Sequence, residues 1–241
     1  MTGAQESPGV AEAPRVDVAT EAGVAQVRVL GPSAGTGSAP GRAPGGGTLL
    51  LGHGAGGQRD AADLVALLGL TAQGWTVVLV DQPWRVAGRK VATRPASLDL
   101  AWAGVTSTLA SSAWQERHGI PLPLPWVAGG RSAGARVACR TSVLPGTPQV
   151  RAVVCLAFPL HPPGRPDRSR ARELALPLDA GLPTLVVQGA SDPFGSPEEI
   201  AEATRTRSEH LTLVRVPGSH SPTRDLAGMR AHVAEFLAAL P

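Results

Sequence analysis

Short apolar runs rich in Val and Leu recur along the chain and alternate with stretches of helical periodicity. The runs occupy residues 48–57, 75–81, 124–130, 150–160, 184–190 and 211–218. Between them, Leu64, Leu67 and Leu68 share one helical face, and longer helical patterns cover 97–118 and 227–240. Continuous apolar strands that alternate with helices are typical of a parallel sheet covered on both faces. The pattern therefore predicts an α/β fold with a mostly parallel, doubly wound sheet.

The N-terminal part of the chain has a different pattern. Residues 15–20 and 25–30 alternate polar and apolar positions on either side of turn residues, which predicts a β-hairpin. Residues 1–14 are rich in Ala, Glu, Gly and Pro, so we expect a disordered tail there. The low-complexity segment 31–47 is predicted to be a flexible surface loop. With 241 residues the chain has the length of one domain, which we place at 15–241.

The overall composition is that of a soluble globular protein, with 43% hydrophobic and 17% charged residues. No apolar run reaches the length of about 18 residues that a membrane-spanning helix needs. The first residues include acidic side chains and no apolar core segment, which argues against a secretory signal. We therefore expect a cytoplasmic protein that does not contact membranes.

Basic residues are nearly all arginine, and the formal net charge is +3. Two local groups stand out in the sequence: Arg85, Arg89, Lys90 and Arg94, and then Arg165, Arg168, Arg170 and Arg172. A solvated rim and a site for an anionic substrate both account for such groups. Because the chain has no Tyr and 3 Phe, we expect no surface that stacks nucleic-acid bases.

The two cysteines, Cys139 and Cys155, fall in a helical pattern and in an apolar strand pattern. They lack the Cys-x-x-Cys spacing of a metal site, and no group of histidines lies near them in the sequence. We therefore interpret both as reduced core residues and predict neither a metal site nor a cofactor.

The stretch GGRSAGAR at 129–136 contains the pattern Gly-x-Ser-x-Gly around Ser132. It follows the apolar run 124–130 and precedes a helical pattern that begins near Ala135. In this strand-turn-helix context, small residues at Gly130 and Gly134 allow a strained turn that exposes a serine hydroxyl at a helix N-terminus. The alternative is a glycine turn with a bystander serine. We interpret Ser132 as a nucleophile because of the residues described next.

A serine needs a base to take its proton, and the base needs an acid that orients it. His220 follows the last predicted strand on a Gly and Ser loop, and Asp192 follows the strand before it. The order Ser, Asp, His along the chain is the order of α/β-hydrolases. Asp81 is a competing acid at the end of an earlier strand, and an Asx turn or a helix cap is the alternative role for Asp192.

The glycine-rich stretch GHGAGG at 52–57 follows a strand and can present free backbone N–H groups. We predict an oxyanion hole formed by the N–H of Ala133, the residue after the nucleophile, and that of Ala55 or Gly56. A phosphate cradle is the alternative for a glycine-rich loop. The stretch lacks both the Gly-Lys-Ser/Thr ending and the Gly-x-Gly-x-x-Gly spacing of nucleotide sites, which argues against it.

On these motifs the chain resembles the α/β-hydrolase superfamily over residues 15–241. The strings GHGAGG, GGRSAGAR, FPLHPPGRP and QGASDPFG are similar to those of a compact subgroup related to dienelactone hydrolases. That group also includes a testis-expressed hydrolase-like protein and a subunit of a human chromatin-acetylating complex. The resemblance implies about eight strands and a triad of Ser132, Asp192 and His220. Only 23 residues, His161 to Pro183, separate two strands where lipase-like relatives carry a cap, so we expect an open site without one.

The expected function is a serine hydrolase that cleaves small carboxylic esters or thioesters through an acyl-enzyme. An inactive α/β-hydrolase-like module that binds a protein or an anionic ligand is the alternative, and a peptidase is a minor one. Six residues are candidates for substrate contact: His53, Trp84, Arg131, Phe158, His161 and Phe194. Arg131 either faces the substrate, where it would pair with a carboxylate, or packs below the turn of Ser132.

Overall fold

The computed structural model describes residues 13–32, 46–56, 60–221 and 223–240. The predicted tail 1–14 and the predicted loop 31–47 lie largely outside these residues, so both remain predictions. Within the described residues, no helix is long and apolar enough to cross a membrane.

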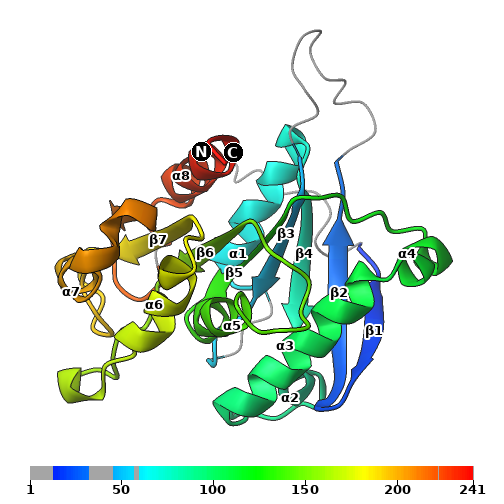
Figure 1. The fold of residues 1–241 in the computed structure, drawn as a ribbon, viewed down its shortest axis with the longest axis horizontal. Helices are drawn as coiled ribbons and strands as arrows, with labels where there is room; N and C mark the ends of the chain where they lie inside the picture. Colours follow the sequence, from blue (N-terminus) through cyan, green and yellow to red (C-terminus); the bar gives the residue numbers. More distant parts are fainter. Residues whose placement is uncertain (1–12, 33–45, 57–59, 222, 241) are drawn as a thin grey trace, which may run out of the picture.

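One eight-stranded sheet runs through the molecule (Figure 1), in the order β1-β2-β4-β3-β5-β6-β7-β8. β1 pairs antiparallel with β2 and β2 antiparallel with β4, whereas all the other neighbours are parallel. The mostly parallel, doubly wound sheet and the N-terminal hairpin are thus confirmed. The strands are β1 (Arg15–Thr20), β2 (Gly23–Leu30), β3 (Thr48–Gly52), β4 (Thr76–Asp81), β5 (Trp126–Arg131), β6 (Ala152–Leu156), β7 (Thr184–Gly189) and β8 (Leu211–Val216).

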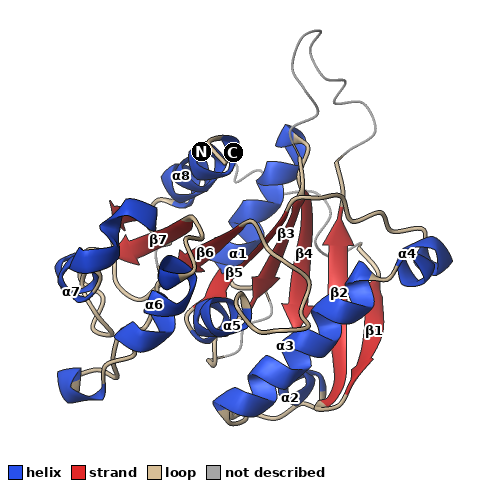
Figure 2. Ribbon diagram, viewed as in Figure 1, coloured by secondary structure: helices blue, strands red, loops and turns tan. Residues whose placement is uncertain are grey.

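Helices cover both faces of the sheet (Figure 2), and each face has its own apolar core. On one face lie α3 (Pro95–Ala110), α5 (Ala133–Thr141) and α6 (Ala171–Asp179), whose buried side chains include Trp102, Val137 and Leu174. On the other face lie α1 (Ala62–Ala66), the 3₁₀ helix η1 (Leu67–Gln73) and α8 (Leu226–Ala238). The remaining helices are α2 (Pro83–Val86), α4 (Ser112–His118), η2 (Pro166–Arg168), α7 (Pro197–Ala203) and η3 (Arg205–His210).

Two of the predicted helices differ from the observed ones. The pattern at 97–118 is two helices, because the side chain of Ser111 accepts a hydrogen bond from the Trp114 N–H and starts α4 at the end of α3. The pattern that follows Asp60 divides into α1 and η1, which closes at Gly74 with a φ of 90°. The short helix α2 has no counterpart among the predicted elements.

The carboxyl ends of the parallel strands lie at one end of the sheet, which runs along the lower and left sides of Figure 1. The register places Gly52 at the end of β3 beside both Val80 of β4 and Gly130 of β5. In such sheets, ligands bind outside the carboxyl ends of the strands. Between β6 and β7, residues 157–183 contain only η2 and α6, so the cap-less architecture is also confirmed.

Candidate active site

Ser132 directly joins β5 to α5, with φ 53° and ψ −108°. This is strained backbone for a residue with a side chain. The Ser132 N–H donates to the Leu156 carbonyl of β6 at 2.9 Å, which holds the turn against the neighbouring strand. The helix begins at Ala133 and not near Ala135, so the serine stands at the N-terminus of α5 itself.

The backbone around this turn is packed too closely for side chains. A Cβ on Gly134 would lie 2.2 Å from the Gly52 carbonyl oxygen, and one on Gly130 would lie 2.4 Å from the same atom. Gly130 also has a φ of 157°. A Cβ on Gly129 would lie 2.6 Å from the Val154 carbonyl oxygen of β6. The glycines of GGRSAG therefore allow the backbones of β5 and α5 to pack directly against the backbones of β3 and β6, with no side chain between them.

The structure brings Ser132, His220 and Asp192 together. His220 lies in the loop after β8, and its Nε2 is 2.8 Å from Ser132 Oγ. Its Nδ1 is 2.8 Å and 3.0 Å from the two carboxylate oxygens of Asp192. Because a carboxylate only accepts hydrogen bonds, the imidazole proton lies on Nδ1, and Nε2 is left to accept the Ser132 hydroxyl. The carboxylate that His220 contacts is that of Asp192 and not that of Asp81.

Asp192 is fixed by two further donors. Its Oδ1 accepts the Phe194 N–H at 2.8 Å, and its Oδ2 accepts Gln188 Nε2 at 2.8 Å. The Asp192 side chain is 0% exposed, whereas the His220 side chain is 18% exposed. The Phe194 ring stacks on His220, with centroids 4.1 Å apart and planes at 29°. The Asp192 carboxylate is therefore held by several hydrogen bonds and shielded from solvent. The His220 imidazole lies between it and the more exposed side of the site.

Arg131 contacts protein on both sides of its guanidinium group. Its Nε lies 2.8 Å from Asp63 Oδ2 of α1, an ionic contact without hydrogen-bond alignment. Its Nη2 donates to the His220 carbonyl at 3.3 Å and to Ser221 Oγ. Burial raises the pKa of Asp63, and the charge of Arg131 opposes that shift. Arg131 thus links α1 to the loop that carries His220.

His53 forms hydrogen bonds that hold the glycine-rich loop after β3 against the segment after β4. Its side chain is buried, its Nδ1 donates to the Gly54 carbonyl at 2.9 Å, and its Nε2 accepts the Gln82 N–H at 3.1 Å. A Cβ on Gly54 would lie 3.6 Å from Ser132 Cβ, so this loop borders the serine directly. Ala55 and Gly56, the predicted oxyanion donors, follow as exposed turn residues. Ala133 is the first residue of α5, where N–H groups have no partner within the helix.

The other candidates for substrate contact lie at different depths. Phe158 is completely buried in the core of the α3 face, and Trp84 is 3% exposed in the same core. The structure therefore does not place Phe158 on the rim of the site. His161 is buried as well, and its Nε2 lies 3.2 Å from Glu199 Oε1. Its backbone N–H donates to the Phe194 carbonyl at 2.9 Å. Phe194 is the one of these aromatic side chains that contacts His220.

Sequence reasoning missed two residues of this network, Gln188 and Asp63. Gln188 is a lone polar residue inside the apolar strand β7, and this was the signal that could have identified it. Asp63 carries no such signal, because an acidic residue in the first turn of a helix is ordinary. Both cysteines are buried free thiols, as predicted. Within the described residues, no group of three His, Cys, Asp or Glu side chains could hold a metal ion.

Comparison with known proteins agrees with this architecture. The family model described as "Alpha/beta hydrolase domain" matches residues 46–230, more than half of the chain. A search of curated proteins found no match.

Solved structures similar to this chain include three hydrolases. An α/β serine hydrolase without a lid from Xanthomonas campestris is 21% identical, with 98% of this chain and 99% of that chain covered and a TM-score of 0.66. A dienelactone hydrolase from Anabaena variabilis is 19% identical, with 95% and 96% covered and a TM-score of 0.63. A thermophilic esterase from Thermogutta terrifontis is 16% identical, with 94% and 93% covered and a TM-score of 0.60. These structures share the fold, and the family match shows that the chain belongs to the α/β hydrolases.

Proposed function

We propose that this protein is a serine hydrolase that cleaves small carboxylic esters or thioesters through an acyl-enzyme intermediate. The observation that carries the proposal is the continuous chain of hydrogen bonds from Ser132 Oγ through His220 to Asp192, with contacts of 2.8 Å on each side of the imidazole. The strained backbone of Ser132 adds support, because strain of this kind concentrates at functional sites.

In the first half of the reaction, Ser132 Oγ attacks the carbonyl carbon and His220 Nε2 takes its proton. Asp192 keeps the imidazole in the required tautomer and stabilises its positive charge. The tetrahedral intermediate then collapses, and His220 donates the proton to the leaving alcohol or thiol. In the second half, His220 takes a proton from the water that attacks the acyl carbon. The second tetrahedral intermediate then collapses as His220 returns the proton to Ser132 Oγ, which releases the acid and the free serine.

Negative charge on the carbonyl oxygen needs donors during both halves. The proposed donors are the Ala133 N–H at the start of α5 and the N–H of Ala55 or Gly56 in the loop braced by His53. Loss of one such donor costs about 3 to 4 kcal/mol in comparable sites. The partial positive charge at a helix N-terminus adds to the effect at Ala133.

The choice of an ester or thioester as substrate rests on two points. The similar structures include an esterase and a dienelactone hydrolase. The cap-less architecture leaves the site open, which suits small substrates that do not need to be enclosed.

A fluorophosphonate probe tests the proposal directly, because it reacts only with an activated serine. We expect the wild-type protein to be labelled and Ser132→Ala not to be labelled. His220→Ala should label at least about 10³-fold more slowly, because the members of a triad act as a unit. Ser112→Ala, which removes an exposed hydroxyl in α4, is the matched control and should label as the wild type does.

Hydrolysis of a short p-nitrophenyl ester by the same variants completes the test. The wild type should turn the ester over, and Ser132→Ala should be inactive. Labelling or turnover that persists in Ser132→Ala would contradict the proposal. A folded wild-type protein that neither labels nor turns over would instead favour the alternative of a binding module.

A further inference from the structure

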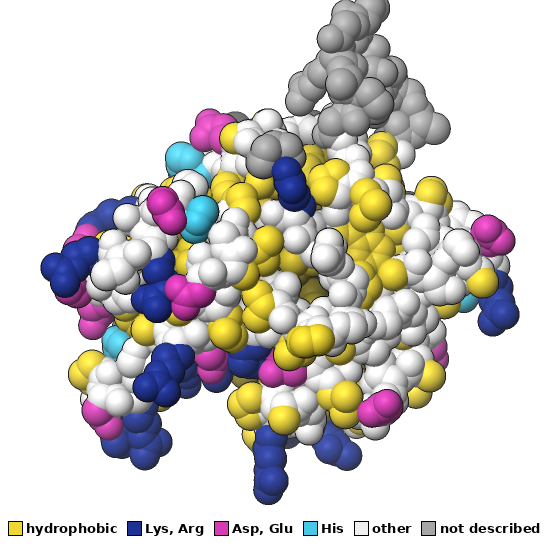
Figure 3. All heavy atoms as spheres, in the orientation of Figure 1, with side chains coloured by type: hydrophobic (Ala, Val, Ile, Leu, Met, Phe, Trp, Pro, Cys, Tyr) yellow, Lys and Arg dark blue, Asp and Glu magenta, His cyan; other side chains and the backbone are white. Residues whose placement is uncertain are grey.

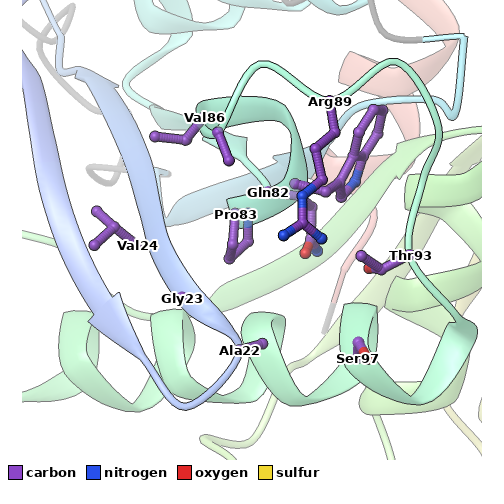
Figure 4. A pocket seen from close by; sticks show the side chains of 11 residues that line it. Ala22, Gly23, Val24, Gln82, Pro83, Val86, Arg89, Thr93 and Ser97 are labelled. Atoms are coloured by element: carbon purple, nitrogen blue, oxygen red, sulfur yellow. The ribbon is translucent and has the colours of Figure 1, made fainter.

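A second hollow lies at the carboxyl end of β4, apart from the serine. It has a volume of about 340 Å³ and is bounded by the β1–β2 turn, by α2 and by the first turns of α3 (Figure 4). Neither Ser132 nor Asp192 nor His220 lines it. A volume above about 300 Å³ is sufficient for a small organic molecule.

Gln82 gives this hollow a polar group without a partner. The residue is 5% exposed and lines the hollow. Its Nε2 donates to the Leu98 carbonyl at 3.2 Å, which fixes the orientation of the amide, since the oxygen cannot face that carbonyl. Its Oε1 is buried and accepts no hydrogen bond within the described part of the chain. A buried acceptor left without a donor is unfavourable, so a ligand that brings an O–H or N–H would be favoured here.

Arg89 gives the same hollow a positive charge. Figure 4 shows its side chain extending from the loop between α2 and α3 into the space that Gln82, Pro83, Thr93 and Ser97 surround. Among the described residues, no carboxylate forms an ion pair with Arg89. Of the residues that the structure describes, Arg89 is the one basic residue that lines the hollow and no Asp or Glu lines it, so the charge at the hollow favours an anion. In Figure 3, basic side chains project from this lower edge of the molecule.

Most of the remaining lining is apolar and includes the side chain of Trp84, while Thr93 and Ser97 contribute two hydroxyl groups. Pro83, Val86, Ala22 and Ala87 contribute apolar surface next to the two polar groups. A pocket with apolar walls and a few convergent polar groups is the usual form of a small-molecule site. The three features together specify a ligand with an aliphatic body, one hydrogen-bond donor and one negative charge.

We propose that this hollow binds a small aliphatic hydroxycarboxylate, whose carboxylate pairs with Arg89, whose hydroxyl donates to Gln82 Oε1 and whose alkyl group packs on Pro83 and Val86. The site is separate from Ser132 and does not depend on the proposed hydrolase activity. Hydrogen bonds nevertheless connect the hollow to the loop beside Ser132. The Gln82 N–H donates to His53 Nε2, and His53 Nδ1 donates to the Gly54 carbonyl.

Isothermal titration calorimetry with α-hydroxyisovalerate tests the site, in the wild-type protein and in Ser132→Ala. We expect a dissociation constant of about 1 mM or tighter, equal in the two proteins because Ser132 does not line the hollow. Isovalerate, which lacks the hydroxyl, and α-hydroxyisovaleramide, which lacks the charge, should each bind at least about tenfold more weakly, as expected for losing one hydrogen bond to a partner in a dry site.

Two variants locate the binding. Arg89→Ala removes an exposed side chain, so folding should be unaffected, and the affinity for α-hydroxyisovalerate should fall at least about tenfold. Ala87→Leu fills part of the hollow and should reduce binding by a similar factor. Arg117→Ala, an exposed arginine of α4, is the matched control and should bind as the wild type does. The proposal is overturned if α-hydroxyisovalerate does not bind to the folded wild type, or if Arg89→Ala and Ala87→Leu bind it with unchanged affinity.

Discussion

The turn from β5 into α5 and the turn from β4 into α2 lie at the same edge of the sheet, with only β3 between them. Adjacent strands are about 5 Å apart, so the two turns are separated by about 10 Å. The first carries Ser132 on strained backbone, packed between glycines that approach the Gly52 carbonyl. The second carries Gln82 beside a hollow of about 340 Å³ and leaves its Oε1 without a donor within the described residues.

The arginines near the two turns also differ in whether they have carboxylate partners. On α5, Arg136 and Arg140 both pair with Glu173 of α6, and Arg140 also pairs with Asp99 of α3. Arg89, after α2, has no such carboxylate among the described residues. The turn proposed to hold the nucleophile is thus close-packed, and both arginines of α5 are paired with carboxylates, whereas the turn at Gln82 combines free volume with an arginine that has no carboxylate partner in the described part of the chain, which suits it to receive a ligand.

The largest effect is expected from adding one carbon to the close-packed turn. In Gly134→Ala, the new Cβ would meet the Gly52 carbonyl oxygen at 2.2 Å, so α5 or β3 must shift. Overpacking of this kind costs about 1 to 3 kcal/mol of stability. A displacement of Ser132 by about 1 Å should lower the proposed esterase activity about 100-fold. Chemical denaturation and hydrolysis of a p-nitrophenyl ester measure the two effects.

Ala87→Leu is the matched addition at the other turn. It adds three carbons beside the hollow, where there is free volume, and should change neither stability nor esterase activity measurably. Equal losses in Gly134→Ala and Ala87→Leu would remove the distinction between the two turns.

An intermediate effect is expected at Arg131. Arg131→Lys keeps the positive charge beside Asp63, so we expect the fold to be retained. A lysine ammonium lacks the planar fork that lets one side chain contact Asp63 and the His220 loop together. We expect kcat to fall about tenfold with little change in KM, because His220 is less well placed while the substrate surface is unchanged. Arg117→Lys in α4 is the control, and an unchanged kcat in Arg131→Lys would show that Arg131 does not position His220.

The alternation of apolar strands and helical faces was sufficient to predict the sheet and its parallel character, because burial on both faces of a strand requires a continuous apolar run. The strand-turn-helix context of Ser132 was equally predictable, since the glycines around it follow an apolar run and precede a helical pattern. Helix boundaries were less predictable. The apolar pattern continues across Ser111, but its backbone is extended, with ψ 121°, and its side chain accepts the Trp114 N–H, which separates α3 from α4.

Residues that act through long-range contacts were the hardest to predict from sequence. Arg131 had two possible orientations, and choosing between them required the position of Asp63, 68 residues earlier in the chain (131 − 63). The hollow at Gln82 depends on the β1–β2 turn and α3 meeting at α2, and α2 itself had no clear periodic signal. Phe158 was predicted to contact the substrate because it follows a strand, but the core of the α3 face encloses it.

The smallest effect is expected at Glu173, which pairs with both arginines of α5. Burial acts to raise the pKa of Glu173, but the hydrogen bonds and charges of Arg136 and Arg140 outweigh it and hold the pKa below its usual range. A carboxyl group whose pKa is lower in the folded state stabilises the fold above its unfolded pKa of about 4.3, and the contribution is lost as the pH falls through the folded pKa. Glu173→Gln should therefore be less stable than the wild type by about 1 kcal/mol at neutral pH.

The pH dependence separates this electrostatic contribution from simple packing. As the pH falls below the unfolded pKa of about 4.3 and towards the lower folded pKa, the contribution of the wild-type carboxylate is progressively lost, so the difference in stability between the wild type and Glu173→Gln should shrink. Urea denaturation at neutral pH and at about pH 3.5 measures the difference under both conditions. Glu202→Gln, an exposed glutamate of α7, is the control and should show little difference at either pH. If the difference in unfolding free energy between the wild type and Glu173→Gln is the same at both pH values, Glu173 stabilises α5 by packing and not by charge. The contrast between paired and unpaired arginines at the two turns would then lose its energetic basis.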